Sequence, residues 1–133
     1  MRKIGIAVSS LAAAVITVSM AGSASAYPGP TTRCYPYMAC FYFNSNQAGA
    51  LATIGEGEYN LDSQVFSPNT GAGAGTYLEN NAASADSRET SIYYCIHRDR
   101  WWSGPYDVLP AQYKMNLSAT YNTNSSTTLY HNH

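Results

Sequence analysis

The chain contains a ten-residue stretch that occurs twice, and this duplication limits the possible folds more than any other feature. The first copy runs from Cys40 to Gly49 and the second from Cys95 to Gly104, so each opens with Cys and closes with Gly at the same spacing. Two further landmarks follow each copy in the same order: a Tyr-containing stretch that ends at Leu61 or Leu117, and then a cluster of Asn and Ser. These matches indicate two copies of one structural unit.

The first 26 residues are typical of a secretory signal peptide. Arg2 and Lys3 form a basic start, residues 4–20 form an apolar run, and residues 24–26 (Ala-Ser-Ala) form a cleavage site. We therefore predict that residues 1–26 are removed and that the protein is secreted and extracellular. An uncleaved N-terminal anchor is the alternative interpretation.

The remaining residues, 27–133, suffice for one compact domain but not for two ordinary ones. We expect the two units at about residues 34–86 and 87–130. No second apolar run is long enough to span a bilayer, so we expect no membrane attachment after cleavage. Without the leader, five scattered basic residues stand against eight acidic ones, which gives little support to nucleic-acid binding.

All three cysteines belong to the part of the chain that we expect to be exported, where disulfides persist. Cys34 and Cys40 enclose a short loop and can bridge it, with a stabilising effect of about 2 kcal/mol. Cys95 is then left over, either as a buried free thiol or as an intermolecular link. No cysteine spacing suggests a zinc site.

Short runs with strand-type composition favour strands at residues 40–43, 50–54, 92–96 and 106–109. Apolar residues do not recur at helical spacing over any long window, so we predict an all-β sandwich. The Gly-rich residues 67–76 are expected to form a long loop, and residues 80–91 a linker between the units. Residues 59–66 fit either a strand or irregular structure.

The order aromatic-x4-aromatic-x-Gly, then Tyr-x-Leu, then an Asn/Ser cluster resembles a βγ-crystallin Greek-key unit. Tyr42 in the first copy and Trp102 in the second fit this pattern, as does the closing glycine of each copy. Gln47 and His97 stand where the other two aromatic residues are expected. The resemblance implies a βγ-crystallin-like sandwich of two Greek-key units, with four strands in each sheet.

The leader, the chain length and the Cys34/Cys40 pair are similar to those of a secreted bacterial peptidase-inhibitor family, typified by the Streptomyces metalloproteinase inhibitor. This resemblance implies inhibition of an extracellular peptidase by an exposed loop, with a metalloprotease as one possible target. Carried onto this sequence, the inhibitory loop is Arg88, Glu89, Thr90, Ser91, Ile92 and Tyr93. The upstream cysteine that closes this loop in the family is missing, so an ordinary linker is the alternative.

The Asn/Ser clusters resemble the calcium sites of βγ-crystallins, in which oxygen atoms bind the ion. The resemblance implies the ligands Asn80, Asn81 and Ser84 in one cluster and Asn122, Asn124 and Ser126 in the other. Neither cluster contains an Asp, so no charge offsets the dehydration of the ion. Turn-stabilising caps are the competing interpretation, and calcium is the one cofactor that we consider.

Trp101 and Trp102 are adjacent, so in a strand one would fill the core and the other would lie exposed, able to stack on a sugar or anchor a protein.

No pair of acidic residues and no nucleophile motif suggests catalysis, and the terminal His131 and His133 fit a tail. We therefore expect a monomeric protein that is not an enzyme. Peptidase inhibition is the first hypothesis; a binding or structural module and a secreted antimicrobial toxin are the alternatives.

Overall fold

The computed structural model describes residues 32–54 and 60–131, and within these ranges it contains strands and turns but no helix. The predicted signal peptide and Tyr59 lie outside the described residues. No described helix is long and apolar enough to cross a membrane. The strands are β1 (Ala39–Asn44), β2 (Ala48–Ile54), β3 (Ser84–Ser87), β4 (Ile92–Asp99), β5 (Ser103–Leu109), β6 (Lys114–Asn116) and β7 (Ser126–His131).

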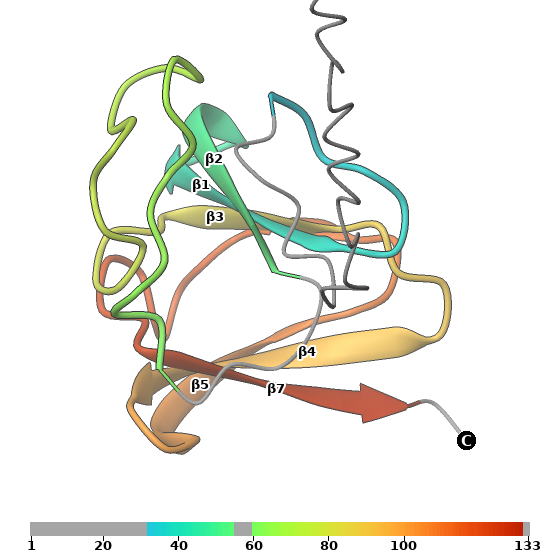
Figure 1. Ribbon diagram of the computed structural model, residues 1–133. Helices are drawn as coiled ribbons and strands as arrows, with labels where there is room; N and C mark the ends of the chain where they lie inside the picture. Colours follow the sequence, from blue (N-terminus) through green and yellow to red (C-terminus); the bar gives the residue numbers. More distant parts are fainter. Residues whose placement is uncertain (1–31, 55–59, 132–133) are drawn as a thin grey trace, which may run out of the picture.

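The strands form two antiparallel sheets that face each other as two layers (Figure 1). One sheet has the order β2-β1-β3-β6 and the other β5-β4-β7. Strand β6 comes from the second half of the chain but pairs with β3 of the first, which is a Greek-key exchange between the units. The prediction of an all-β sandwich of two Greek-key units is confirmed.

Among the described residues the second sheet has three strands rather than the expected four, and residues 55–59 lie outside the described residues. In the first sheet the backbone N–H of Leu117, just after β6, donates to the carbonyl of Ala83. The N–H of Leu61 makes the equivalent bond to the carbonyl of Ser125, at 2.9 Å, beside the second sheet. The chain at Leu61, close to where the described residues resume, thus lies where a fourth strand would lie.

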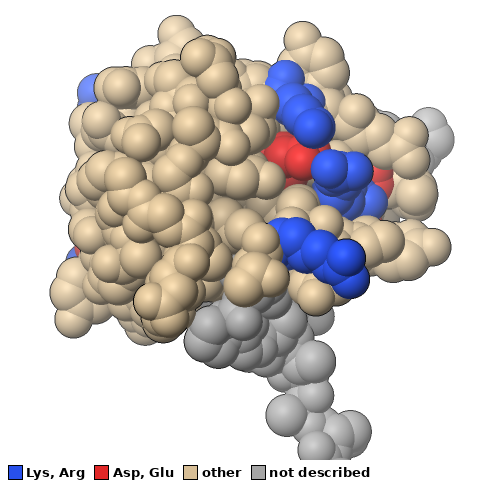
Figure 2. Space-filling model, turned by 90° about the horizontal axis from the view of Figure 1, so that it is seen from above, with Lys and Arg blue, Asp and Glu red and all other residues tan. Residues whose placement is uncertain are grey.

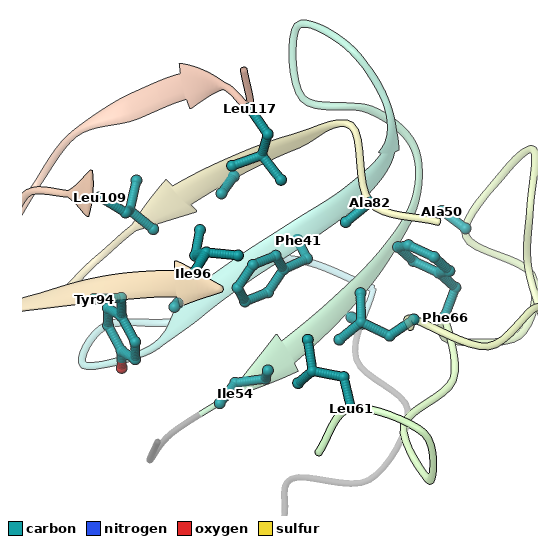
Figure 3. Packing of buried hydrophobic residues seen from close by; sticks show 14 residues of the cluster. Phe41, Ala50, Ile54, Leu61, Phe66, Ala82, Tyr94, Ile96, Leu109 and Leu117 are labelled. Carbon is teal, nitrogen blue, oxygen red and sulfur yellow. The ribbon is translucent and has the colours of Figure 1, made fainter. Parts of the chain in front are cut away.

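The two central strands have matching registers, which confirms the duplication seen in the sequence. On β1, Cys40 lies opposite Asp86 of β3, and on β4, Cys95 lies opposite Thr128 of β7. Phe41 and Ile96 follow these cysteines and face each other between the sheets (Figure 3). Equivalent residues of the two units therefore meet at the centre of the sandwich.

The core is built from both sheets and from the chain that connects them. It consists of Ala39, Phe41, Ala50, Ala52, Ile54, Leu61, Phe66, Leu78, Ala82, Ala85, Tyr94, Ile96, Leu109 and Leu117 (Figure 3). Each large aliphatic or aromatic side chain buried in this way contributes roughly 1.5–3 kcal/mol. Five of these core residues are alanines, which pack between the larger side chains.

The interpretation of residues 80–91 as a linker is wrong, because they include β3, which lies between β1 and β6 inside the first sheet. The sequence Ser-Ala-Asp-Ser lacks the β-branched and aromatic residues that mark strands. All four residues are nevertheless buried. Tertiary pairing on both sides, rather than local propensity, makes this segment a strand.

Each duplicated stretch forms a tightly folded hairpin with left-handed backbone at three positions. The φ angles are 61°, 55° and 79° at Asn46, Gln47 and Gly49, and 59°, 59° and 77° at Trp101, Trp102 and Gly104. Glycine adopts this region without the steric cost that a Cβ brings, which explains why each copy closes with Gly.

Both Trp side chains are exposed, so the expectation that one fills the core is wrong: they lie in a turn and not in a strand.

Candidate functional site

The two Asn/Ser clusters lie against each other where the units cross. The backbone N–H of Asn80 donates to the carbonyl of Asn124 at 2.8 Å, and that of Asn122 donates to the carbonyl of Ala82 at 2.9 Å. The Asn124 side chain is fully buried, and its Oδ1 accepts a bond from the N–H of Ala82. These contacts join the two units.

Ser84 and Ser126, one from each cluster, hold the two folded hairpins. The Ser84 hydroxyl donates to the carbonyl of Asn44 at 2.6 Å and accepts from the N–H of Gln47 at 3.0 Å. The Ser126 hydroxyl donates to the carbonyl of Asp99 at 2.6 Å and accepts from the N–H of Trp102 at 3.1 Å. Both hydroxyls therefore have a structural role in the same geometry.

Asn81 is also engaged locally, because its side-chain amide donates to the carbonyls of Tyr77 and Glu79, each at 3.0 Å. Within the described part of the chain, no three His, Cys, Asp or Glu residues are grouped so that they could hold a metal ion. A calcium ion would have to rely on amide, hydroxyl and carbonyl oxygens. The assignment of these clusters as calcium ligands stays a prediction.

The segment predicted to be the inhibitory loop is a short crossing between the two sheets. Arg88 is fixed to the chain that follows Cys34: its N–H donates to the carbonyl of Met38 at 2.8 Å, and its carbonyl accepts from the N–H of Tyr37 at 3.0 Å. Glu89 is buried, and its carboxylate accepts a hydrogen bond from the hydroxyl of Tyr94. Thr90 and Ser91 are exposed, whereas Ile92 and Tyr93 already belong to β4.

The predicted disulfide between Cys34 and Cys40 is confirmed, with 5.8 Å between the two Cα atoms. Cys95 is a buried free cysteine, which agrees with the first of the two alternatives, a buried free thiol. Burial raises the pKa of its thiol above the usual range, and a hydrogen bond with Thr128 opposes this only in part. A protonated thiol is a poor nucleophile, which gives Cys95 little reactivity at neutral pH.

A cavity of about 430 Å³ opens beside the disulfide loop. It is lined by Cys34, Pro36, Tyr37, Asp86, Ser87, Arg88, Thr90, Gln112 and Lys114. Figure 2 shows the molecule from the side of the first sheet, where basic side chains surround an acidic one. The Asp86 carboxylate accepts from Arg88 Nε at 3.0 Å and lies 4.0 Å from Lys114 Nζ.

The outer face of the second sheet has a different character, which is aromatic and uncharged. Because Tyr94, Ile96 and Leu109 point into the core, strand alternation turns their neighbours outward. The outward residues are Tyr93, Cys95 and His97 on β4, Tyr106 and Val108 on β5, and Ser126, Thr128 and Tyr130 on β7. The rings of Tyr93 and Tyr130 stack with centroids 5.2 Å apart and an interplanar angle of 12°. We call these eight residues the aromatic face.

His97 lies in the middle of the aromatic face and is buried by its neighbours. Its Nε2 is 3.1 Å from the Thr128 hydroxyl, and its ring is tilted against Tyr106. Burial lowers the pKa of the imidazole below its usual value, which favours the neutral form at neutral pH. The aromatic face is therefore free of formal charge.

Arg100, at the tip of the second hairpin, binds the first unit. Its Nε and Nη2 atoms donate to the two carboxylate oxygens of Glu79 at 2.9 and 3.0 Å, and Nη2 lies 3.3 Å from Asp62. These contacts are exposed to solvent, so they orient the hairpin more than they stabilise the fold. The exposed Trp101 and Trp102 are presented beside this ion pair.

Comparison with solved structures identifies the fold. A structure that bears on the evolution of the eye-lens βγ-crystallin domain fold superimposes with a TM-score of 0.57 and 13% identity, over 79% of this chain and 96% of that one. βγ-Crystallin domains from Clostridium beijerinckii (TM-score 0.53, 17% identity, 70% and 97% coverage) and Flavobacterium johnsoniae (0.52, 18%, 71% and 94%) are also similar. The chain has the βγ-crystallin fold.

At the level of sequence, no family model matches the chain, and no curated protein matches it. The structural similarity at these low identities shows the fold alone. It gives no support to the peptidase-inhibitor family in particular. What the chain binds must therefore be argued from its own surfaces.

Sequence reasoning missed Asp86 and Asp107 as structural residues. The buried Asp107 carboxylate accepts bonds from the N–H groups of Ser118, Ala119 and Thr120 and from the Thr120 hydroxyl. Asp107 lies between Tyr106 and Val108, and a polar residue at an inward strand position is the signal that could have revealed it. Asp86 gave no such signal, because its strand was not recognised.

Proposed function

We propose that the protein is a non-enzymatic binding module whose ligand is a neutral polysaccharide, bound on the aromatic face. The observation that carries this proposal is the composition of that face: the exposed rings of Tyr106 and Tyr130, which end in hydroxyl groups, and no charged side chain among the eight residues. Exposed apolar surface rimmed by polar groups is typical of interaction sites. Rings stack on the apolar faces of sugars, while hydroxyl groups pair with theirs.

The shape of the surface supports a polymeric ligand. A sheet face is extended and open, so a polymer can lie across several strands. Tyr106 on β5 and Tyr130 on β7 are exposed on opposite sides of β4. A rigid Tyr side chain offers a large contact area at a small entropic cost, which suits a ligand with repeated weak contacts.

Affinity electrophoresis and pull-down on insoluble cellulose, chitin and β-1,3-glucan test this proposal. We expect retention by at least one of these polymers, weakened about tenfold by Tyr106→Ala, the usual effect of truncating a central aromatic contact. Tyr113→Ala is the matched control, because Tyr106 and Tyr113 are both 54% exposed but Tyr113 is not on the aromatic face. Absence of retention, or equal loss in both variants, would contradict the proposal.

The same face could instead bind a second copy of the chain, and sedimentation distinguishes the two cases. The proposal expects a monomer for both the wild type and Tyr106→Ala. A dimer that dissociates in Tyr106→Ala but not in Tyr113→Ala would show that a second copy covers the aromatic face, and the polysaccharide proposal would be wrong.

Inhibition of an extracellular peptidase is the second candidate, acting through residues 88–93. The observation that favours it is the support of Arg88 by two backbone bonds to Tyr37 and Met38, inside the loop closed by the Cys34–Cys40 disulfide. This support rigidifies one end of the segment although the segment has no disulfide of its own. Rigidity lowers the entropic cost of binding to a protease cleft.

Titration against a thermolysin-type metalloprotease, a subtilisin and a trypsin tests the second candidate. Near-stoichiometric inhibition that is lost in Thr90→Pro would support it. Thr123→Pro, at another exposed loop position, is a stringent control for general effects of proline, because it also removes the hydrogen bond from the Thr123 N–H to the carbonyl of Thr120. If every protease stays fully active, residues 88–93 act only as a connection between the sheets.

Calcium binding by the Asn/Ser clusters also remains a proposal. Thermal unfolding with calcium and with a chelator gives a direct test, since a ligand that binds only the folded state raises the melting temperature. We expect a small rise, because the clusters bring amides rather than carboxylates. An identical melting temperature in both conditions would leave the clusters with their structural role alone.

A further inference from the structure

We propose that the cavity beside the Cys34–Cys40 disulfide is a binding site for a small anionic group, a carboxylate or a phosphate. Its volume of about 430 Å³ lies within the range of small-molecule sites. Asp86 of the cavity points outward from β3 of the first sheet, whereas the aromatic face belongs to the second sheet, which forms the other layer (Figure 1). This inference therefore does not depend on the proposed polysaccharide ligand.

Basic side chains outnumber acidic ones around the cavity. Arg88 and Lys114 line it, and Arg33 precedes the lining residue Cys34 in the chain. Among the described lining residues, the only acidic side chain is that of Asp86, which is 3% exposed. The site is therefore locally positive, in a chain whose overall balance is slightly negative.

Several hydrogen-bond donors of the cavity have no acceptor among the described residues. Asp86 occupies only the Nε of Arg88, and the two Nη groups make no hydrogen bond to any residue in the described ranges. Lys114 Nζ, the Gln112 amide and the Thr90 hydroxyl likewise make no hydrogen bond there. The cavity thus presents several unused donors, which suit the oxygens of a carboxylate or phosphate.

The buried Asp86 orients the Arg88 side chain in the cavity. Its carboxylate fixes the Nε edge of Arg88, which leaves the other edge of the guanidinium plane for a ligand. The disulfide loop forms one wall, with Cys34 Sγ 3.9 Å from the carbonyl oxygen of Asp86. Two backbone bonds from this loop hold Arg88 itself. Arg88 is thus preorganised for a ligand, which reduces the entropic cost of binding.

NMR titration of the mature chain with inorganic phosphate and with glucuronate tests the proposal and distinguishes the two ligand chemistries. We expect shifts of the Thr90 and Gln112 amide signals with at least one probe, reduced by added salt because the contacts are charged. Arg88→Gln should weaken the binding about tenfold, and Lys114→Gln by less, since charge-assisted hydrogen bonds are among the stronger ones.

Arg98→Gln is the matched control. Arg98 is 49% exposed and paired with Asp99, much as Arg88 is 47% exposed and paired with Asp86, but it lies outside the cavity. Lys114→Gln keeps the test valid if Arg88→Gln unfolds, because Lys114 only approaches Asp86. The absence of shifts at Thr90 and Gln112 with both probes, or an equal loss in Arg98→Gln, would overturn the proposal.

Discussion

Cys40 in the first unit and Cys95 in the second occupy the same place in their sheets, but the surfaces around them differ. Cys40 forms a disulfide and lies opposite Asp86, whereas Cys95 is a free thiol opposite Thr128. Two residues further on, Tyr42 corresponds to His97. One backbone arrangement therefore carries a charged cavity on one side and a neutral aromatic face on the other.

The comparison indicates that the fold constrains the inward residues and the hairpins, whereas the outward positions are free to vary. Phe41 and Ile96 keep the apolar character of the core, and Ser84 and Ser126 make the same two hydrogen bonds. The outward positions have no such requirement. They are where the two copies have acquired different chemistry, and hence where the proposed ligands differ.

The largest expected effect comes from a residue that only the second unit has. Asp107 corresponds to the buried Ala52, because Ile96 pairs with Asp107 as Phe41 pairs with Ala52. Asp107→Ala leaves the backbone amides of residues 118–120 without their acceptor, and we expect a loss of about 3 kcal/mol in the free energy of unfolding. Chemical denaturation measures this loss, and a change below about 1 kcal/mol would contradict the assigned role.

Reduction of the disulfide should have the next largest effect and should concern the first unit only. We expect reductant to lower the free energy of unfolding by about 2 kcal/mol, because the enclosed loop is short. Denaturation with and without reductant measures the difference. Cys95→Ala must keep this difference, whereas the double variant Cys34→Ala/Cys40→Ala must lose it.

Ser84 and Ser126 allow the energetic contributions of the two hairpins to be compared. Ser84→Ala and Ser126→Ala each remove two hydrogen bonds from a folded hairpin, and we expect each to cost about 1.5 kcal/mol. Denaturation curves of the two variants should therefore agree. A cost confined to one of them would mean that the hairpins are not energetically equivalent, despite their matching geometry.

The smallest effect concerns the pH dependence contributed by His97. Burial lowers the pKa of His97 in the folded protein, so below about pH 6.5 the unfolded chain binds more protons than the folded one. The free energy of unfolding should consequently decrease as the pH falls below this value. His97→Gln should make the dependence shallower, and an unchanged dependence would show that other groups are responsible.

The duplication, the all-β class and the pairing of Cys34 with Cys40 could be predicted from the amino-acid sequence. These features depend on local composition and on residue spacing, both of which can be read along the chain. The hairpin glycines belong here as well, since Gly49 and Gly104 occupy backbone conformations that favour glycine wherever they occur. The strand composition of residues 92–96 was sufficient to predict β4.

The pairing of the strands and the contacts between outward residues could not be predicted from the sequence and follow from the three-dimensional fold. β3 has no strand propensity of its own and exists because β1 and β6 flank it. The cavity joins Cys34, Arg88 and Lys114, and the aromatic face joins Tyr93, Tyr106 and Tyr130, residues far apart in the chain. Their proximity follows from long-range strand register, and register depends on the burial of one whole sheet face, which no short stretch of sequence records.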